Sequence, residues 1–160
     1  MTREGPIEVR NEDVGGAVRA VATAVRRVPL ESVWRAATDY EHYTEFMPRT
    51  CEAVVERRTE REVVFRTALD FVLKKVRYRL RLQLDRAAGH VSWTLLDGDL
   101  RRCEGSWQLD DLGQGLTRIT YTSLVESAIP VPKRIEAGLL GKSLPEVVEK
   151  TVERARRLSA

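Results

Sequence analysis

Hydrophobic and polar residues alternate most regularly between Val76 and Leu84. The apolar and polar series occupy alternate positions, with Val76, Tyr78, Leu80, Leu82 and Leu84 in one series and Arg77, Arg79, Arg81 and Gln83 in the other. A period of two is typical of a β-strand that buries one face. The segment is therefore predicted to be a strand with an apolar inner face and an arginine-rich outer face.

Three further strands are predicted between Val91 and Glu126. Turn sequences separate them at Asp97-Gly98 and at Gly113-Gln114-Gly115. The middle strand puts Cys103, Gly105, Trp107 and Leu109 on one face and Arg102, Glu104, Ser106 and Gln108 on the other. The same alternation on neighbouring strands predicts an antiparallel sheet with one apolar face.

Helical spacing of apolar residues occurs in three places. Residues 30–38 predict a short helix, and Asp39 is a candidate N-cap for a second one that runs through Tyr40 and Phe46 to Pro48. A broad apolar stripe after Pro132 predicts a long C-terminal helix.

The predicted order is one strand at 17–28, two short helices, six strands and the long helix. The remaining strands fall at 51–57 and 62–71. A seven-stranded antiparallel sheet with a single apolar face needs one cover, which the long helix supplies, so the fold class is α+β. Residues 1–16 are expected to be a loose lead-in, and residues 17–160 a single domain.

Composition and charge narrow the class of protein. The chain has 160 residues, of which 32% are charged and 42% hydrophobic, as in globular domains. The first residues lack the apolar core of a secretory signal and no window is apolar enough to span a membrane, so neither is expected, and the two cysteines favour a reduced, cytoplasmic location. The formal charge of +3 permits an acidic partner or contact with an anionic membrane.

The inward face of the predicted sheet supplies the first candidate binding residues. Aromatic side chains dominate it, and Tyr78 and Tyr121 add hydroxyls that need partners when buried. The candidates are Phe65, Phe71, Thr67, Tyr78, Leu80, Trp93, Cys103, Trp107, Tyr121 and Ser123. Any one of these side chains more often simply fills a core, but as a set they form a largely apolar wall with a few polar groups, which is typical of a ligand pocket.

Both helical regions next to the sheet add candidates. Tyr40, Tyr43, Phe46 and Met47 lie on the second short helix, where they either gate a pocket or pack against the sheet. Ile135 and Leu139 lie on the apolar stripe of the long helix and would face the sheet.

Catalytic and metal-binding patterns are not found. His42 and His90 lack a neighbouring nucleophile or carboxylate arrangement typical of a triad. The cysteines and histidines are too scattered for metal ligands, so neither a metal nor another cofactor is expected.

A basic stripe runs along the predicted outer face. It comprises Lys74, Lys75, Arg77, Arg79 and Arg81, with Arg101 and Arg102 nearby. Such a stripe is usually a solvated sheet face, and the functional alternative is attraction to anionic lipids. Nucleic acid is not an expected partner, because no exposed aromatic residues alternate with these charges.

Several short motifs resemble the START-like superfamily, and within it the polyketide cyclase and coenzyme Q-binding START-domain group. The motifs are Pro29 with Val33-Trp34, the run Asp39 to Pro48, Gly98-Asp99, Gly105-Ser106-Trp107-Gln108-Leu109, Gly115-Leu116-Thr117-Arg118, and Pro130 with Pro132. Together they cover roughly residues 18–158. The resemblance implies a helix-grip fold, in which a seven-stranded curved sheet wraps around the last helix and encloses a deep hydrophobic cavity.

The same resemblance implies that the second short helix lies near the cavity mouth. Cyclases of this group place charged groups in the cavity, and Arg66 is the corresponding candidate here. Strand parity opposes this role, because Phe65 and Thr67 take the inward positions, and only a one-residue bulge would turn Arg66 inward.

Three functions follow as expectations. The first is binding or transport of a hydrophobic small molecule, such as a lipid, an isoprenoid quinone or a polyketide-like compound. The second is a polyketide aromatase/cyclase or dehydratase that works by positioning and proton transfer. The third is a protein-interaction module with a vestigial pocket. The predicted inward face of the sheet has no charged side chain that clearly points into the cavity, which favours binding over catalysis.

Overall fold

An eight-stranded antiparallel sheet forms most of the molecule. The computed structural model of the protein describes residues 4–15, 17–71, 74–127 and 133–159, with positions 18, 71, 74, 127 and 133–143 described at the level of the backbone. The strands lie in the order β1-β2-β8-β7-β6-β5-β4-β3. In chain order the elements are β1 (Glu8–Val14), β2 (Ala17–Arg27), α1 (Leu30–Ala37), the 3-10 helix η1 (Tyr40–His42), α2 (Tyr43–Phe46), β3 (Thr50–Arg58), β4 (Glu62–Phe71), β5 (Lys74–Asp85), β6 (His90–Gly98), β7 (Leu100–Gly113), β8 (Leu116–Ser127) and α3 (Lys133–Leu158).

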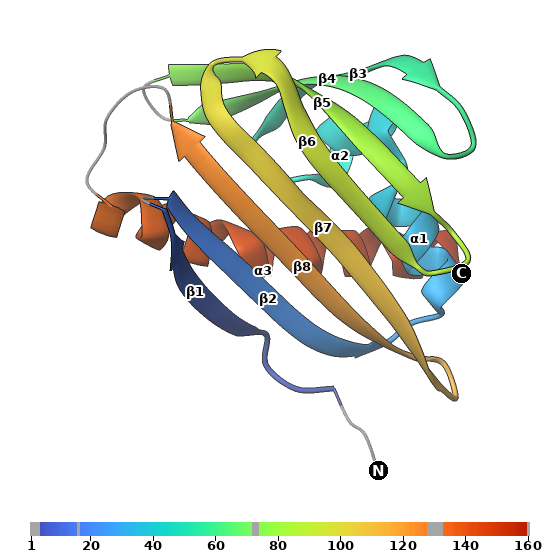
Figure 1. Ribbon diagram of the computed structural model, residues 1–160. Helices are drawn as coiled ribbons and strands as arrows, with labels where there is room; N and C mark the ends of the chain where they lie inside the picture. The colour runs from blue at the N-terminus through green and yellow to red at the C-terminus, as the bar shows by residue number, and fades with distance from the viewer. Residues whose placement is uncertain (1–3, 16, 72–73, 128–132, 160) are drawn as a thin grey trace.

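The sheet curves around α3, as the helix-grip prediction requires (Figure 1). In this view α3 crosses behind the sheet, and its C-terminal end lies beside α1. The predicted α+β class, the two short helices and the long final helix are confirmed.

The predicted number of strands is wrong, because the sheet has eight strands and not seven. The additional strand is β1, within the segment expected to be a lead-in. It pairs with β2 from Glu8 opposite Thr23 to Val14 opposite Ala17. Its side chains are mostly exposed on both faces, so its sequence lacks the apolar alternation that marks a half-buried strand.

Asp39 precedes the second helical region, but its side chain makes no capping hydrogen bond. The structure has η1 and α2 in place of one helix, and neither has a side-chain capping bond at its N-terminus. The Asp39 carboxylate instead contacts His42 and Arg154. Asp39 thus occupies the N-cap position of η1, as predicted, but its carboxylate is engaged by His42 and Arg154 and makes no capping hydrogen bond.

The core is tightly closed where α1 and the C-terminal half of α3 meet the sheet. Val33 of α1, Ile119 of β8 and Val152 of α3 are all almost inaccessible to solvent. Arg26 of β2 lies at the same end and pairs with Glu149 of α3 at 2.7 Å. No helix in the part of the chain that is described has both the length and the apolar character needed to cross a membrane.

Candidate ligand-binding site

Tryptophan and tyrosine side chains of three adjacent strands form one wall of the concave face. The rings of Trp107 and Tyr121 lie 4.4 Å apart between centroids, and those of Trp93 and Tyr121 lie 5.7 Å apart. Tyr121 stands directly opposite Trp107 in the β7–β8 register. Trp107 has the inward position predicted for it on β7. Tyr121 is paired with Trp107, and Trp93 is paired with Gly105 on the same face of β7, so all three side chains lie on the α3 side of the sheet.

A second aromatic cluster joins the short helices to β4. Phe65 of β4 contacts the rings of Tyr40 and Tyr43, at centroid distances of 5.2 and 5.7 Å. Tyr43 also packs edge-on against Phe46 at 5.4 Å. These contacts attach η1 and α2 to the far side of the same concave face.

Solvent exposure varies among the inward-facing side chains of the concave face. Val91 and Leu109 are buried, and so are Cys103 and Ser123. Tyr78, Tyr121 and Val125 also face inward but are only partly buried. Parts of these three side chains therefore remain accessible on the concave face.

Burial changes the acid–base properties of this face. Desolvation is the main cause that raises the pKa of Tyr78 and of Tyr121 well above the usual range, and nearby Cys103 raises each pKa further. Burial likewise raises the pKa of the Cys103 thiol to about 12. These groups keep their protons at neutral pH, so they are hydrogen-bond donors rather than bases.

Hydroxyl groups on this face differ in whether they have a partner. Tyr43 donates its hydroxyl hydrogen to the carbonyl of Ala37. Thr67 donates to the carbonyl of Glu52 at 2.8 Å. Within the described residues, the buried hydroxyl of Tyr40 has no hydrogen-bond partner. The Thr67 hydroxyl thus links β4 to β3, whereas the Tyr40 hydroxyl has no acceptor among the described residues.

The remaining candidate residues fall into three groups. Leu80, Cys103 and Ser123 are buried, and all three share the inward parity of their strands. Phe46 is partly buried and lies beside α3, where the guanidinium carbon of Arg154 is 5.2 Å from its ring. The side chains of Phe71, Ile135 and Leu139 lie outside the described residues.

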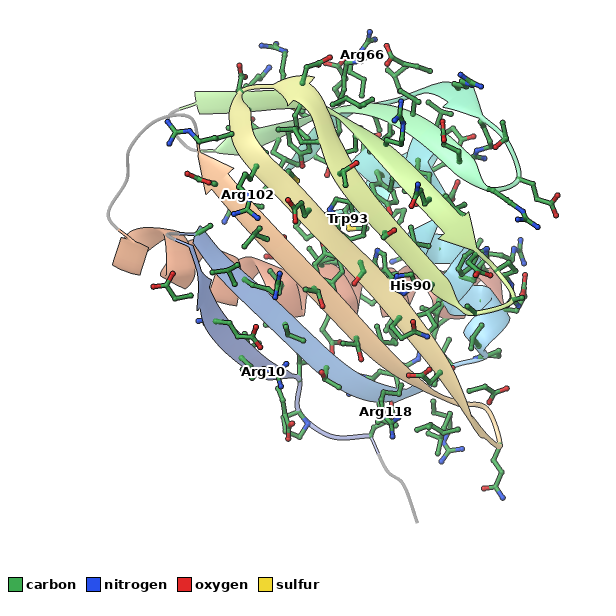
Figure 2. All side chains as sticks on the ribbon, in the orientation of Figure 1. Arg10, Arg66, His90, Trp93, Arg102 and Arg118 are labelled. Carbon is green, nitrogen blue, oxygen red and sulfur yellow. The ribbon has the colours of Figure 1, made fainter. Side chains whose placement is uncertain are left out.

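Arg66 lies on the outer face of the sheet. Its guanidinium pairs with Glu52 at 3.0 Å and with Glu56 at 3.6 Å, and its side chain is 47% exposed. Figure 2 shows the side chain directed away from the concave face. The structure does not bring Arg66 together with the aromatic wall.

Acidic neighbours interrupt the basic stripe of the outer face. Arg79 bonds to both Glu56 and Asp97, and Arg81 lies 3.9 Å from Glu62. Two further pairs, Arg101 with Glu126 and Arg102 with Glu104, follow the same pattern. Local charge along the stripe is therefore lower than the sequence of basic residues suggests.

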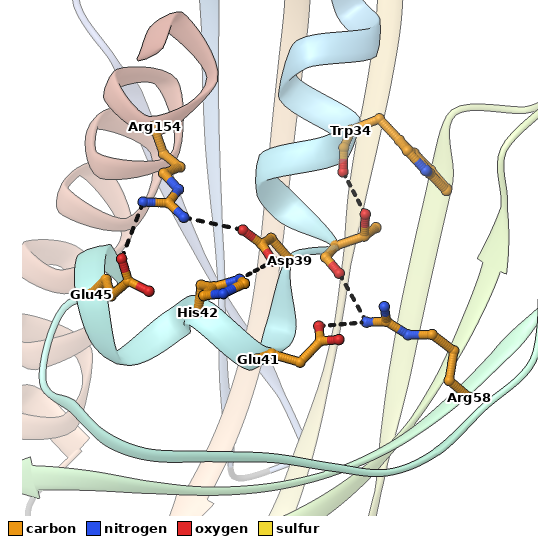
Figure 3. A network of polar contacts seen from close by, with 8 residues as sticks. Trp34, Asp39, Glu41, His42, Glu45, Arg58 and Arg154 are labelled. Carbon is orange, nitrogen blue, oxygen red and sulfur yellow. Dashed lines mark hydrogen bonds and ion pairs between the residues drawn. The ribbon is translucent and has the colours of Figure 1, made fainter. Parts of the chain in front are cut away.

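The sequence did not reveal a polar network that ties α2 to α3 (Figure 3). Asp39 is 2.6 Å from Nδ1 of His42 and 3.3 Å from Arg154. Arg154 also lies 3.5 Å from Glu45. The Asp39–His42 hydrogen bond is the main cause that raises the pKa of His42. Arg154 is 115 residues from Asp39, so no local pattern could have paired them.

A shallow hollow of about 530 Å³ lies on the opposite, outer face of the sheet. Its floor includes Val21 and Leu124, and charged side chains of β1, β2 and β7 border it. Arg10, Glu12 and Arg19 form ion pairs along that border. Part of this border comes from β1, so the hollow could not be foreseen without the eighth strand.

Comparison with known proteins supports this arrangement. Residues 27–152 match the sequence model of the family described as polyketide cyclase / dehydrase and lipid transport. No curated protein sequence matches the chain.

Solved structures resemble the fold closely. The protein TTHA0849 from Thermus thermophilus superposes with a TM-score of 0.81 at 23% identity, over 89% of this chain and 99% of that one. The Zhui aromatase/cyclase from Streptomyces sp. R1128 gives 0.79 at 15% identity, over 89% and 95%. Human StAR-related lipid transfer protein 5 gives 0.80 at 11% identity, over 99% and 86%. With its helix-grip architecture and a match over most of its length, the chain belongs to the polyketide cyclase / dehydrase and lipid transport family.

Proposed function

We propose that the protein binds a hydrophobic small molecule between the concave face of the sheet and α3. The observation that carries this proposal concerns Tyr78 and Tyr121. Both side chains face the concave side, burial raises the pKa of each, and both keep some accessible surface. Partly accessible aromatic side chains on an inward-facing, largely apolar surface support a ligand site there.

Hydrophobic transfer supplies the affinity in this proposal. Removing apolar ligand surface from water contributes roughly 25 cal/mol per Å². The rings of Trp93 and Trp107 pack against Tyr121, so the accessible part of Tyr121 belongs to an aromatic cluster beside the proposed ligand. The family match and the lipid-transfer and aromatase/cyclase neighbours agree with such a ligand, be it a lipid, a quinone or a polyketide-like compound.

Binding is better supported than catalysis. Among the described groups on this face, burial raises the pKa of the tyrosines and of Cys103. Groups that hold their protons at neutral pH can orient a ligand or polarise a carbonyl, but they do not remove a proton. A cyclase or dehydratase reaction would need a base from elsewhere.

Two matched variants of β8 test the location. Val125→Trp adds an indole to the partly buried inward face, and Thr122→Trp adds the same group to the outer hollow. Native mass spectrometry of each purified protein detects bound small molecules, which are then extracted. The uptake of a hydrophobic fluorescent probe is measured separately. We expect Val125→Trp to reduce uptake and Thr122→Trp to leave it unchanged. Equal uptake by both variants and the wild type, or no uptake by the wild type, would contradict the proposal.

A further inference from the structure

We propose that the hollow on the outer face of the sheet is a second binding site, and that it accepts a small hydroxylated anion. The ligand class is an organic molecule that carries several hydroxyl groups and one phosphate or carboxylate group. The hollow and the concave face lie on opposite sides of the sheet, so this proposal does not rest on the proposed function.

The hollow forms where short side chains occupy the centre of the outer face. Ser106 of β7 is opposite Thr122 of β8, and Thr122 is opposite Val21 of β2. The row ends at Arg10 of β1, which is opposite Val21. Short side chains beside a long one leave a space of about 530 Å³. This volume falls within the range of about 300–1,000 Å³ that is typical of small-molecule sites.

Hydroxyl groups lie in the base of the hollow. Ser106, Thr120 and Thr122 line it and are partly exposed. Within the described residues, none of these three hydroxyls has a hydrogen-bond partner. Val21 and Leu124 close the floor, but they are only 9% and 1% exposed and offer little surface to a hydrophobic ligand. Because each hydroxyl can both donate and accept, the base suits a ligand with hydroxyl groups of its own.

Two arginines at the border share one carboxylate. Glu12 is 3.3 Å from Nε of Arg10 and 3.6 Å from Nη1 of Arg19. The other N–H groups of both guanidiniums have no partner in the part of the chain that the structure describes. Hydrogen bonds from arginine to a phosphate or a carboxylate are charge-assisted and stronger than neutral ones. This border is therefore suited to an anionic oxygen group.

The other acidic groups near the hollow already have cationic partners. Glu104 borders the hollow and lies 3.4 Å from Arg102. Glu126, two residues after Leu124 on β8, does not border it and lies 3.3 Å from Arg101. Among the described side chains, the ion pairs that include a bordering residue comprise three arginines and two glutamates, which leaves one positive charge in excess.

Four ligands separate the contributions of charge and of hydroxyl groups. Glucose 6-phosphate and glucuronate carry both, glucose carries hydroxyl groups alone, and inorganic phosphate carries charge alone. Binding is followed by amide chemical shifts in proton–nitrogen NMR spectra of the wild type, Arg10→Gln and Arg19→Gln. Arg118→Gln is the matched control, because Arg118 has the same outward parity on β8 as Thr120 but does not border the hollow.

We expect at least one of the two hydroxylated anions to bind, with shift changes centred on Ser106 and Thr122. Its affinity should exceed the affinities of glucose and of inorganic phosphate by at least about fivefold. Whether glucose 6-phosphate or glucuronate binds more tightly identifies the anionic group. Arg10→Gln and Arg19→Gln should each weaken this binding by about threefold to tenfold, the loss of one hydrogen bond, and Arg118→Gln should leave it unchanged.

Three results would overturn the proposal. Glucose binding as tightly as both hydroxylated anions would show that the arginines hold no anion. Equal affinity for inorganic phosphate would show that the hydroxyl groups are not used. The absence of binding, or shift changes away from the hollow, would overturn the second site and leave the hydrophobic site on the concave face standing.

Two controls complete the test. An excess of the hydrophobic fluorescent probe should leave the binding of the hydroxylated anion unchanged, and displacement would contradict two separate sites. Thermal unfolding checks that each variant is folded. The Arg10 side chain is 71% exposed, so Arg10→Gln keeps the test decisive if Arg19→Gln proves unstable.

Discussion

The indole ring of Trp93 occupies the space into which a side chain at Gly105 would project. A β-carbon built on Gly105 would lie 2.4 Å from Cζ2 of Trp93 and 2.4 Å from the carbonyl oxygen of Thr122. Gly105 is opposite Trp93 on β6 and opposite Ser123 on β8. The absent side chain lets the indole lie close against the strand and extend the aromatic wall toward Tyr121.

Substitution of Gly105 should therefore destabilise the protein. Gly105→Ala forces the backbone of β8 or the Trp93 ring to move, and overpacking of this kind costs about 1–3 kcal/mol. The free energy of unfolding is measured by urea denaturation. Gly5→Ala is the control, because a β-carbon there meets no atom within 4 Å and the expected change is close to zero. Wild-type stability in Gly105→Ala would show that the indole is not held in this position.

The two cysteines should differ sharply in reactivity. Cys51 is exposed, whereas Cys103 is buried and its pKa is raised to about 12. Thiolate is the reactive form, and at pH 8 on the order of one Cys103 thiol in ten thousand is ionised. We expect an aromatic disulfide reagent to modify one thiol rapidly in the native protein and the second only after unfolding. Rapid modification of Cys103 in a Cys51→Ser variant would contradict the burial of this thiol on the concave face.

Stability should depend on the protonation of His42. The hydrogen bond to Asp39 raises the pKa of His42 above its ordinary value of 6.5, with Glu45 adding to the effect and Arg154 opposing it. The folded protein therefore holds this proton more tightly than the unfolded chain does. The resulting stabilisation is complete below pH 6.5 and is lost as the pH rises through the raised pKa.

The measurement is the difference in unfolding free energy between the wild type and His42→Gln at about pH 5 and about pH 9. We expect the wild type to be the more stable of the two at low pH and to lose this advantage at high pH. A difference that does not vary with pH would argue against the Asp39–His42 contact.

Replacement of Arg66 should leave ligand binding unchanged. Its guanidinium pairs with Glu52 and Glu56 on the outer face, and its side chain is 47% exposed. Exposed ion pairs contribute little, so Arg66→Gln should change the unfolding free energy by no more than about 1 kcal/mol. Probe affinity is compared with that of the wild type. A large loss of affinity would mean that Arg66 reaches the ligand and would revive the cyclase alternative.

The sheet, its inward face and the final helix could be predicted because each has a strong local pattern. Alternation in β5 and β7 identified the inward positions of Tyr78 and Trp107, since one residue of shift would reverse every side chain. The outward position of Arg66 followed from the same parity. The family motifs added the arrangement of these elements around α3.

Other features depend on contacts that no local pattern encodes. Strand β1 is polar on both faces, so only its hairpin pairing with β2 identifies it. The contact of Asp39 with Arg154 joins residues that are far apart in the chain. The unpartnered hydroxyl of Tyr40 likewise depends on which groups surround it, and residue type alone did not distinguish it from Tyr43.

The most direct test of the central claim is to locate a bound hydrophobic ligand by NMR. Intermolecular NOEs are measured between 2-acetylnaphthalene and assigned methyl groups on the two faces of the sheet. The inward methyl groups are those of Leu80, Leu95 and Val125, and the outer ones are those of Val21 and Leu124 in the hollow. We predict NOEs to the inward group. NOEs confined to Val21 and Leu124, or the absence of any binding, would contradict a ligand held between the sheet and α3.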